Sequence, residues 1–268
     1  MQNLTNDIIL HQNIDGTEFI QFKKLLEFPN IKHCYTLRKN DINVQIKNND
    51  KSSLVASYEK IGKALGFDYK NIVKPHQTHT DNVEIVKNVN QQFEEVDGVI
   101  TNKENIFLCT TSADCTSFLF YDYKKNVIGD IHSGWRGTLK QIGKKAVKKM
   151  VEAYSCNPKD IICCISPCIK KCHFEVEEEV KNMFEAEFKY TGKINEIIEQ
   201  GRILDGVQKY NIDTTLINKI SLMEAGLKEE NIIDSNICTV CNSDLFHSYR
   251  VDREMSGRNG AFIGMVSQ

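Results

Sequence analysis

The sequence lacks the features that mark several classes of protein. It has only four prolines and one tryptophan in 268 residues, and it contains no internal repeat and no low-complexity linker. No apolar run reaches the roughly 18 residues that a membrane-spanning helix needs. Residues 1–10 have neither a basic segment nor a long apolar core, which argues against a signal peptide. These absences predict a cytoplasmic protein that makes no membrane contact.

Charge of one sign is also scarce. The formal net charge is −2, and no long block of like charge occurs, so the sequence offers no patch for nucleic acid or anionic lipid. The lysine-rich segment 140–149 has apolar residues threaded through it, which is typical of the solvent-facing side of a helix. The apolar and charged content is ordinary for a globular protein. Because α/β enzymes of this length often fold as one unit, we expect a single domain over residues 1–268.

Short apolar or β-branched runs alternate with longer helical patterns. Helices are expected at 53–65, from Thr138 onward, after Phe174 with Val176 on its buried face, and at 213–225. Strands are expected at Ile31–Leu37, Asn82–Val86, Gly98–Thr101, Ile106–Thr110, Ser117–Tyr121, Val127–His132, Ile161–Ile165, Ile232–Cys238 and Ala261–Val266. Because strands outnumber helices and several are consecutive, the pattern favours an α+β fold with mixed sheets.

Three segments each place a potential metal ligand at a strand end or a tight turn. They are residues 75–80 with His76 and His79, residues 110–115 with Cys115, and residues 130–138 with His132. One histidine of the first segment, Cys115 and His132 would make three protein ligands and leave a fourth position open, as in catalytic zinc sites. Copper is the chemical alternative. The residues alone do not choose between His76 and His79, and each candidate has a plain alternative as a surface histidine or a core thiol.

The third segment also suits an anion. Gly134 and Gly137 bracket Trp135 and Arg136, and a helix is expected to begin near Thr138. Free N–H groups at a helix start attract phosphate, and an arginine adds a fork of donors. The alternative is that this is an ordinary strand–glycine–helix turn, most of which bind nothing.

Cysteine is abundant, with ten residues, and in a reducing compartment this favours thiols, metal ligands or nucleophiles over disulfides. Cys168, Cys172, Cys238 and Cys241 would together supply four thiolates for a structural metal site. Neither pair lies in a recognisable zinc-ribbon turn, so free thiols are the favoured interpretation.

Several motifs in order resemble one known family. They are His-Gln-Thr-His at 76–79, Asp-Gly-Val at 97–99, Thr-Ser-Ala-Asp-Cys at 111–115, His-Ser-Gly-Trp-Arg-Gly at 132–137, Ser-Pro-Cys-Ile at 166–169, Phe-Glu-Val at 174–176, Cys-Thr at 238–239, Ser-Tyr-Arg at 248–250 and Gly-Arg at 257–258. Over about residues 30–268 the sequence is similar to the YfiH/YlmD-like family, long called the multicopper polyphenol oxidoreductase (laccase) domain family. The human protein FAMIN carries the same domain.

The resemblance implies metal ligands, fold and activity. It selects His79 over His76 and implies that His79, Cys115 and His132 bind zinc. It implies an α+β fold related to toxin deamidases of the cytotoxic necrotizing factor type. It also implies a purine nucleoside phosphorylase that also has adenosine deaminase activity. The implied substrates are phosphate and adenosine, inosine, guanosine or methylthioadenosine, and the implied protein is a monomer or weak homodimer.

Further residues are assigned roles within the activity that the resemblance implies. Catalytic roles are assigned to Arg136 and to Asp114 and Glu175, the nearest candidates in the sequence for proton transfer, and the alternative for Asp114 is a side chain that stabilises a turn. Binding of substrate or phosphate is assigned to Arg38, Gln77, Arg136 and Arg250. The sequence departs from many relatives in three places: the segment 35–40 around Arg38 lacks a glycine pair, and Ser166 and Glu177 replace glycines.

Three other functions compete with this one. Cys115 and His132 could form a nucleophile–base pair of a hydrolase or deamidase. A copper-dependent polyphenol oxidase is disfavoured, because the chain has seven histidines and no His-x-His pair. A metal-dependent binding module would hold metal but turn over no nucleoside.

Overall fold

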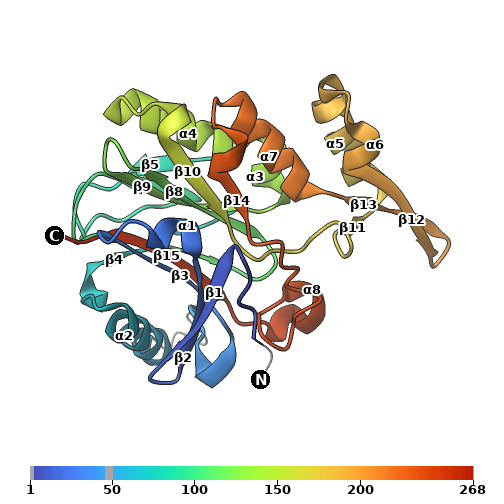
Figure 1. Cartoon of the computed structure of the whole chain (residues 1–268). Helices are drawn as coiled ribbons and strands as arrows, with labels where there is room; N and C mark the ends of the chain where they lie inside the picture. Colours follow the sequence, from blue (N-terminus) through green and yellow to red (C-terminus); the bar gives the residue numbers. More distant parts are fainter. Residues whose placement is uncertain (1–2, 46–50, 268) are drawn as a thin grey trace.

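Two six-stranded mixed sheets, packed face to face, form the centre of the molecule (Figure 1). The structure is a computed structural model and describes residues 3–45 and 51–267. The first sheet has the order β1 (Ile9–Ile14), β2 (Thr17–Phe22), β3 (Ile31–Thr36), β15 (Asn259–Met265), β7 (Phe107–Ser112) and β4 (Ile72–Val73). The second has the order β14 (Ile232–Asp234), β10 (Ile161–Ile165), β8 (Thr116–Asp122), β9 (Val127–Ser133), β6 (Gly98–Thr101) and β5 (Val83–Ile85).

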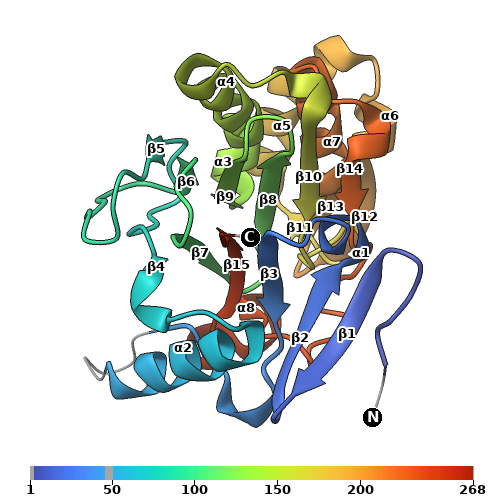
Figure 2. The ribbon, with the colours of Figure 1, turned by 60° about the vertical axis from the view of Figure 1, so that its left-hand side comes forward.

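Helices cover the outer face of each sheet, which gives four layers (Figures 1 and 2). Helix α2 (Ser52–Leu65) packs on the first sheet, and α4 (Ile142–Tyr154) packs on the second beside α7 (Thr214–Glu224). A small third sheet of β11 (Glu175–Val176), β13 (Val207–Ile212) and β12 (Ile198–Leu204) projects to one side. The remaining helices are α1 (Lys23–Leu26), α3 (Trp135–Leu139), α5 (Glu178–Phe188), α6 (Ile194–Ile197) and α8 (Tyr249–Asp252).

Strand β8 shows why the layers hold together. Its side chains alternate between the two faces of the second sheet, as the pleat requires. Leu119 and Tyr121 face the first sheet and join the core between the sheets. Phe118 and Phe120 face the opposite way and join the core beneath α4. Because both faces are covered, the strand is apolar on both, which explains its uninterrupted Phe-Leu-Phe-Tyr run.

The predicted α+β fold with mixed sheets is confirmed, and every predicted strand overlaps an observed one. Three local predictions were wrong. The helix expected from Thr138 is two helices, because Gln141 adopts a left-handed conformation (φ 56°) between α3 and α4. The strand expected to reach Cys238 ends at Asp234. Val176 lies in β11 and not on α5.

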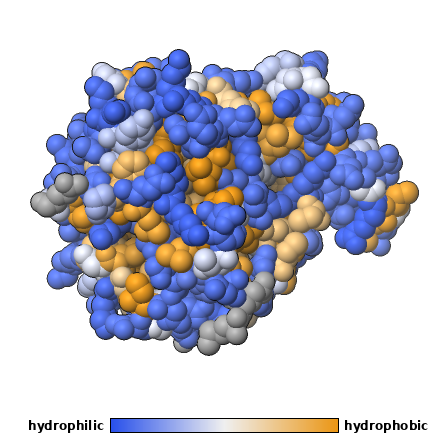
Figure 3. Space-filling model, in the orientation of Figure 1, coloured by the Kyte–Doolittle hydropathy of each residue, from blue (hydrophilic) through white to orange (hydrophobic). Residues whose placement is uncertain are grey.

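Two hairpins were not predicted. The turn between β1 and β2 is Asp15-Gly16, and the turn between β12 and β13 is Asp205-Gly206. All four residues have positive φ, which is the geometry of the two-residue turns that Asp-Gly favours. The second hairpin exposes Ile203, Leu204 and Val207. Figure 3 shows hydrophobic atoms at the right-hand edge of the molecule, where this hairpin lies in the same orientation in Figure 1.

No helix in the described ranges combines the length and apolar character needed to cross a membrane.

The inter-sheet core makes a stability prediction. Leu119 is 1% exposed at the centre of this core, so Leu119→Ala leaves a cavity there. We expect the free energy of unfolding to fall by about 2–5 kcal/mol, measured by urea denaturation. The control is Val55→Ala on the outer side of α2, where Val55 is 36% exposed, and a change within about 0.5 kcal/mol is expected. Equal effects of the two substitutions would contradict the assignment of this core.

Candidate metal centre

Strand register brings Cys115 and His132 to the same end of the second sheet. Strands β8 and β9 are antiparallel, and Thr116 pairs with Ser133 and Ser117 with His132. Cys115 directly precedes this pairing, so the start of β8 and the end of β9 place the thiol beside the imidazole. Residues 17 positions apart in the sequence are therefore neighbours because a β-hairpin folds back on itself.

His79 reaches the same point from a loop that a buried carboxylate holds in place. Asp97 is fully buried, and its Oδ1 accepts a hydrogen bond from the N–H of His79 at 3.0 Å. Its Oδ2 accepts from the N–H groups of Thr78 at 3.2 Å and Thr80 at 2.7 Å, and from the Thr80 hydroxyl at 2.7 Å. These bonds support a backbone that is left-handed at His79 (φ 62°), a conformation uncommon outside glycine.

The same carboxylate orients His132. Asp97 Oδ1 lies 2.8 Å from His132 Nδ1, so this ring nitrogen donates to the carboxylate. The other ring nitrogen, Nε2, is the atom of His132 that could bind a metal. Strand β6 sets this contact, because Gly98 pairs with Ile131 and the His132 N–H donates to the Asp97 carbonyl at 2.7 Å. A carboxylate behind a histidine is the usual support of a metal-binding imidazole.

Opposite charges pair within the cluster and shift the pKa values of Asp97, His132 and Cys115. Burial alone would raise the pKa of Asp97, but the hydrogen bond and charge of His132, with hydrogen bonds from Thr80, hold it at about 2. Burial would lower the pKa of His132, but Asp97 and Cys115 raise it to about 9. Burial would raise the pKa of Cys115, but hydrogen bonds from His132 and His79 lower it to about 6. Cys115 is therefore a thiolate beside the protonated ring of His132, and a metal that binds the thiolate would displace the proton of that ring.

The spacing of the donors fits a single ion. The ligand atoms of His79, Cys115 and His132 all lie within 4.8 Å of one another, and Cys115 Sγ is 3.9 Å from His79 Nε2. The two imidazole rings lie edge to face with centroids 5.0 Å apart. His76, the alternative left open by the residues alone, lies outside the cluster, where it is exposed and pairs with Glu94 at 2.6 Å. The cluster of His79, Cys115 and His132 could therefore bind a metal.

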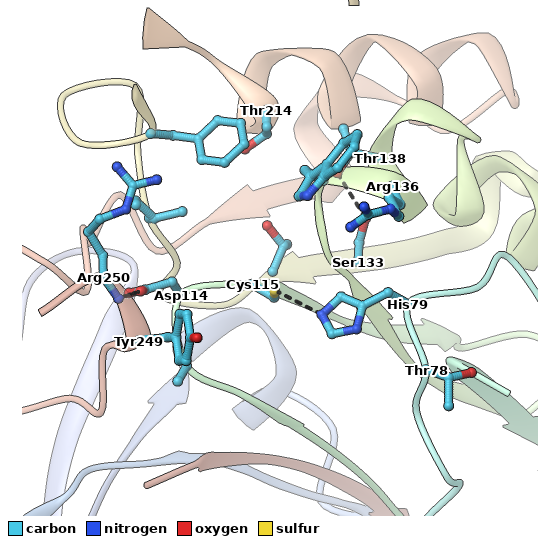
Figure 4. A pocket seen from close by; sticks show the side chains of 15 residues that line it. Thr78, His79, Asp114, Cys115, Ser133, Arg136, Thr138, Thr214, Tyr249 and Arg250 are labelled. Carbon is cyan, nitrogen blue, oxygen red and sulfur yellow. Dashed lines mark hydrogen bonds between the residues drawn. The ribbon is translucent and has the colours of Figure 1, made fainter. Parts of the chain in front are cut away.

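The cluster opens into a pocket of about 410 Å³, a size typical of small-molecule sites (Figure 4). Aromatic side chains from three separate segments line it: Trp135 on α3, Phe174 before β11, and Tyr249 on α8. Thr214, at the start of α7, adds a hydroxyl to the same wall. The pocket therefore combines planar apolar surfaces with polar groups, as sites for flat heterocycles do.

Two arginines lie at the pocket. Arg136 is exposed on α3, stacks over the Trp135 ring at 4.1 Å, and forms no ion pair within residues 3–45 and 51–267. Arg250 lies on the opposite side in Figure 4, and its guanidinium donates to the carbonyls of His173 at 2.7 Å and Glu175 at 3.3 Å. Arg136 is thus available to a ligand, whereas Arg250 also holds the wall of the pocket.

Asp114 lines the pocket with both carboxylate oxygens occupied. Oδ1 accepts from the Thr239 hydroxyl at 2.6 Å, and Oδ2 accepts from the backbone N–H of Arg250 at 2.6 Å. Asp114 has φ 87°, and its carbonyl accepts from the Ile169 N–H at 2.8 Å. Its contacts are therefore those of a side chain that joins three loops around the pocket.

Three other residues assigned from the sequence are not among those that line this pocket. Both amide atoms of Gln77 bond the backbone of Thr111 in β7. Arg38 donates to the carbonyl of Ser243 and pairs with Asp252 at 2.9 Å, which ties β3 to α8. The Glu175 carboxylate accepts two hydrogen bonds from Arg202, at 3.0 and 3.2 Å. Each holds a neighbouring segment in place.

Sequence reasoning placed Asp97 in a family motif and Gly134 in a glycine turn, but did not find the contacts that either residue makes. The signal for Asp97 is an acidic residue directly before the apolar strand 98–101, because a charge buried at such a position is costly unless hydrogen bonds satisfy it. Gly134 has a backbone that any residue adopts (φ −70°), but a Cβ there would lie 2.5 Å from His79 Cδ2 and 3.4 Å from Cys115 Sγ. The need for glycine arises from close packing and not from a turn.

The chain is similar to proteins of one family. The model of the family described as "Multi-copper polyphenol oxidoreductase laccase" matches residues 33–266. Purine nucleoside phosphorylase YlmD of Bacillus subtilis is 31% identical over 234 residues, which cover 84% of this chain and 82% of that protein. Purine nucleoside phosphorylase CA_C1699 of Clostridium acetobutylicum is 29% identical over 258 residues, with 94% and 98% covered.

Solved structures share the fold. The crystal structure of the Bacillus licheniformis hypothetical protein YfiH superposes with a TM-score of 0.82 at 24% identity, covering 95% of this chain and 98% of that one. YlmD from Geobacillus stearothermophilus gives a TM-score of 0.82 at 23% identity, covering 96% and 99%.

Gly134 provides a test of the cluster geometry. In Gly134→Ala the added methyl group must displace the His79 ring, so we expect metal affinity to fall roughly ten- to hundredfold, the range seen when support of metal ligands is lost. Zinc affinity would be measured by competition with a chromophoric chelator. The control is Gly137→Ala, whose added Cβ lies no closer than 3.3 Å to any neighbouring atom. Unchanged affinity in Gly134→Ala would show that His79 is not held against this backbone.

Proposed function

The chain belongs to the multi-copper polyphenol oxidoreductase laccase family, and from this membership we propose that it is a metal-dependent purine nucleoside phosphorylase. The observation that carries the proposal is the opening of the histidine–cysteine cluster into a pocket lined by aromatic rings and two arginines. Curated relatives that cover most of the chain are named purine nucleoside phosphorylases. We therefore assign the pocket to a nucleoside and phosphate.

We propose zinc as the metal, held by His79, Cys115 and His132. Mixed imidazole and thiolate donors suit zinc, and three protein ligands leave one position open. When bound, zinc supplies Lewis acidity next to the pocket. The chain's own contribution is the buried Asp97, which keeps the His132 ring in one orientation and the His79 loop in one conformation.

The aromatic side chains would hold the purine base. A planar heterocycle stacks on aromatic rings for roughly 1–3 kcal/mol per base. Trp135 on α3, Phe174 before β11 and Tyr249 on α8 come from three separate segments of the lining. The Thr214 hydroxyl is placed to donate to or accept from the base or the ribose.

Arg136 would bind phosphate. In phosphorolysis a phosphate oxygen forms a bond to the anomeric carbon while the bond from that carbon to the purine nitrogen breaks, and the departing base takes up a proton. The guanidinium of Arg136 faces the pocket, has no carboxylate partner in the described chain, and would hold the hydrogen phosphate dianion, whose proton the departing base can take up. Arg250 would add positive charge from the opposite wall, in the position that Asp114 gives it.

The remaining assignments are proposals of different kinds. We propose Asp114 as a positioning residue, because both of its oxygens are engaged by Thr239 and Arg250. Glu175 pairs with Arg202 away from the lining, so its proposed effect is on the loop that carries the Arg250 contacts. Adenosine deamination is proposed as a second reaction of the same pocket, and release of ammonia from adenosine measures it directly.

One observation favours a second candidate function. Cys115, His132 and Asp97 contact one another in the order of a nucleophile, a base and an orienting carboxylate. Burial would raise the pKa of Cys115, but the hydrogen bonds and charges of His132 and His79 outweigh burial and lower this pKa to about 6. A metal-free protein whose Cys115 reacts rapidly with iodoacetamide would favour this hydrolase. Protection of Cys115 by bound metal, lost on chelation, would favour the phosphorylase.

The central experiment pairs metal content with turnover. Adenosine, inosine and guanosine would be incubated with purified protein, with and without phosphate, and the freed base and ammonia measured. We expect phosphate-dependent base release, which His79→Ala and Cys115→Ala abolish because each removes a metal ligand. His76→Ala is the matched control and should retain activity, since His76 lies outside the cluster. Stoichiometric zinc without release of base or ammonia from any nucleoside would refute the proposal.

Arg136 makes a separate prediction. Arg136→Ala removes a charged donor to phosphate, so we expect the KM for phosphate to rise roughly ten- to hundredfold, while the KM for the nucleoside changes little. Steady-state kinetics at varied phosphate would measure this. Lys144→Ala is the control, because Lys144 is also cationic but pairs with Glu224 at 3.0 Å and does not line this pocket. Equal KM values for phosphate in the Arg136→Ala and native proteins would remove Arg136 from the phosphate site.

A further inference from the structure

A second group of potential metal ligands lies outside the pocket. Cys172 and His173 are in the turn between β10 and β11, and Cys238 and Cys241 are in the turns that follow β14. Backbone bonds hold these segments together, because Cys168 and Cys238 form an isolated parallel bridge, with the Cys168 N–H donating to the Ile237 carbonyl at 3.2 Å. Residues nearly 70 positions apart in the sequence thus converge on one point.

The four ligand atoms are spaced as the corners of a tetrahedron. Zinc–sulfur bonds of about 2.3 Å place two thiolates of a tetrahedral site about 3.8 Å apart. Cys172 Sγ and Cys241 Sγ are 3.9 Å apart. His173 Nδ1 lies 3.2 Å from Cys172 Sγ, 3.6 Å from Cys238 Sγ and 3.4 Å from Cys241 Sγ. All four atoms lie within 4.8 Å of one another, so one ion reaches every donor without rearrangement of the backbone.

Cys168 is not part of this group. Its Sγ is buried and lies 3.7 Å from the Thr215 hydroxyl, on the side of α7. The four-thiolate set considered from the sequence was therefore wrong in one member, and His173 takes the fourth corner. Three thiolates and one imidazole make a closed set that leaves no position for a substrate, which is typical of structural zinc.

We propose that Cys172, His173, Cys238 and Cys241 bind a structural zinc ion that clamps the turn between β10 and β11 to the turns after β14. Cys238 is buried beneath the cluster, whereas Cys172 and Cys241 are exposed and provide the path of entry. The set contains no oxygen ligand, and thiolate sulfur with imidazole nitrogen favours zinc over magnesium or calcium.

The clamp acts on the pocket through the two segments it joins. The carbonyl of His173 accepts a hydrogen bond of 2.7 Å from Arg250. A zinc ion bound to the His173 ring would therefore hold in place the carbonyl to which Arg250 donates. Thr239 follows Cys238 directly, and its hydroxyl donates to Asp114 at 2.6 Å. The ion therefore lies behind the wall that carries Arg250 and Asp114. The proposal does not depend on which reaction the pocket performs.

The test counts metal in a protein that keeps only the second cluster. In zinc-loaded, dialysed protein we expect about two zinc ions per chain, read by elemental mass spectrometry against protein concentration. Cys115→Ala removes a ligand of the first cluster and should leave about one. Cys115→Ala combined with Cys241→Ser should leave none, whereas Cys115→Ala combined with Cys168→Ala, the matched control, should keep about one.

A spectroscopic measurement covers the case in which a variant folds poorly. Cobalt(II) exchanged into folded Cys115→Ala protein should give the intense visible absorption of a tetrahedral site and a strong thiolate-to-cobalt charge-transfer band, since three thiolates bind it. Chelation of the ion should lower the thermal midpoint of unfolding of this variant. Neither measurement uses catalytic activity, so failure of the phosphorylase proposal leaves the result interpretable.

Two outcomes would overturn the proposal. One is a Cys115→Ala protein that binds no zinc and gives no tetrahedral cobalt spectrum. The other is a disulfide between Cys172 and Cys241 in protein purified under reducing conditions, detected by alkylation and mass spectrometry, because it would consume two of the ligands.

Discussion

The buried carboxylate of Asp97 is the constraint on which the candidate metal centre depends. It lies at the start of β6, fully removed from solvent, and accepts hydrogen bonds from the backbone of residues 78–80 and from the ring of His132. A buried charge is costly unless several donors surround it. Here the hydrogen-bond donors are the backbone around His79 and the ring of His132, two of the candidate metal ligands. The same hydrogen bonds therefore satisfy the buried charge and bring these two residues together.

The four-layer arrangement explains why the site lies where it does. The two sheets bury the apolar side chains between the layers and form a rigid frame. Within this frame the register of β8 and β9 places Cys115 and His132 side by side. Loops at that end of the second sheet, from residues 78–80 to α8, then line the pocket. Rigid strands thus fix two of the candidate ligands, and loops contribute the third candidate and most of the lining.

The two clusters of cysteine and histidine are connected through the wall of the pocket. Asp114 precedes Cys115 in the first cluster and accepts from Thr239, which follows Cys238 in the second. Arg250 donates to the carbonyl of His173 while its own N–H bonds Asp114. A structural ion in the second cluster would therefore stabilise the position of the pocket's charged groups without touching a substrate, as supporting contacts do in other metal sites.

The sequence by itself determined the α+β class, the central strands and the three segments that carry His79, Cys115 and His132, because alternating apolar residues and ligands at strand ends are local signals. It did not decide between His76 and His79 without the family resemblance. It favoured free thiols at Cys168, Cys172, Cys238 and Cys241, and did not point to His173, which the structure brings beside Cys172, Cys238 and Cys241. Only the tertiary structure assigned Gln77, Arg38 and Glu175 to contacts outside the pocket lining, and revealed Asp97 and Gly134. The physical reason is that hydrogen-bond partners and close contacts join residues far apart in the chain, and no local pattern records which of them meet.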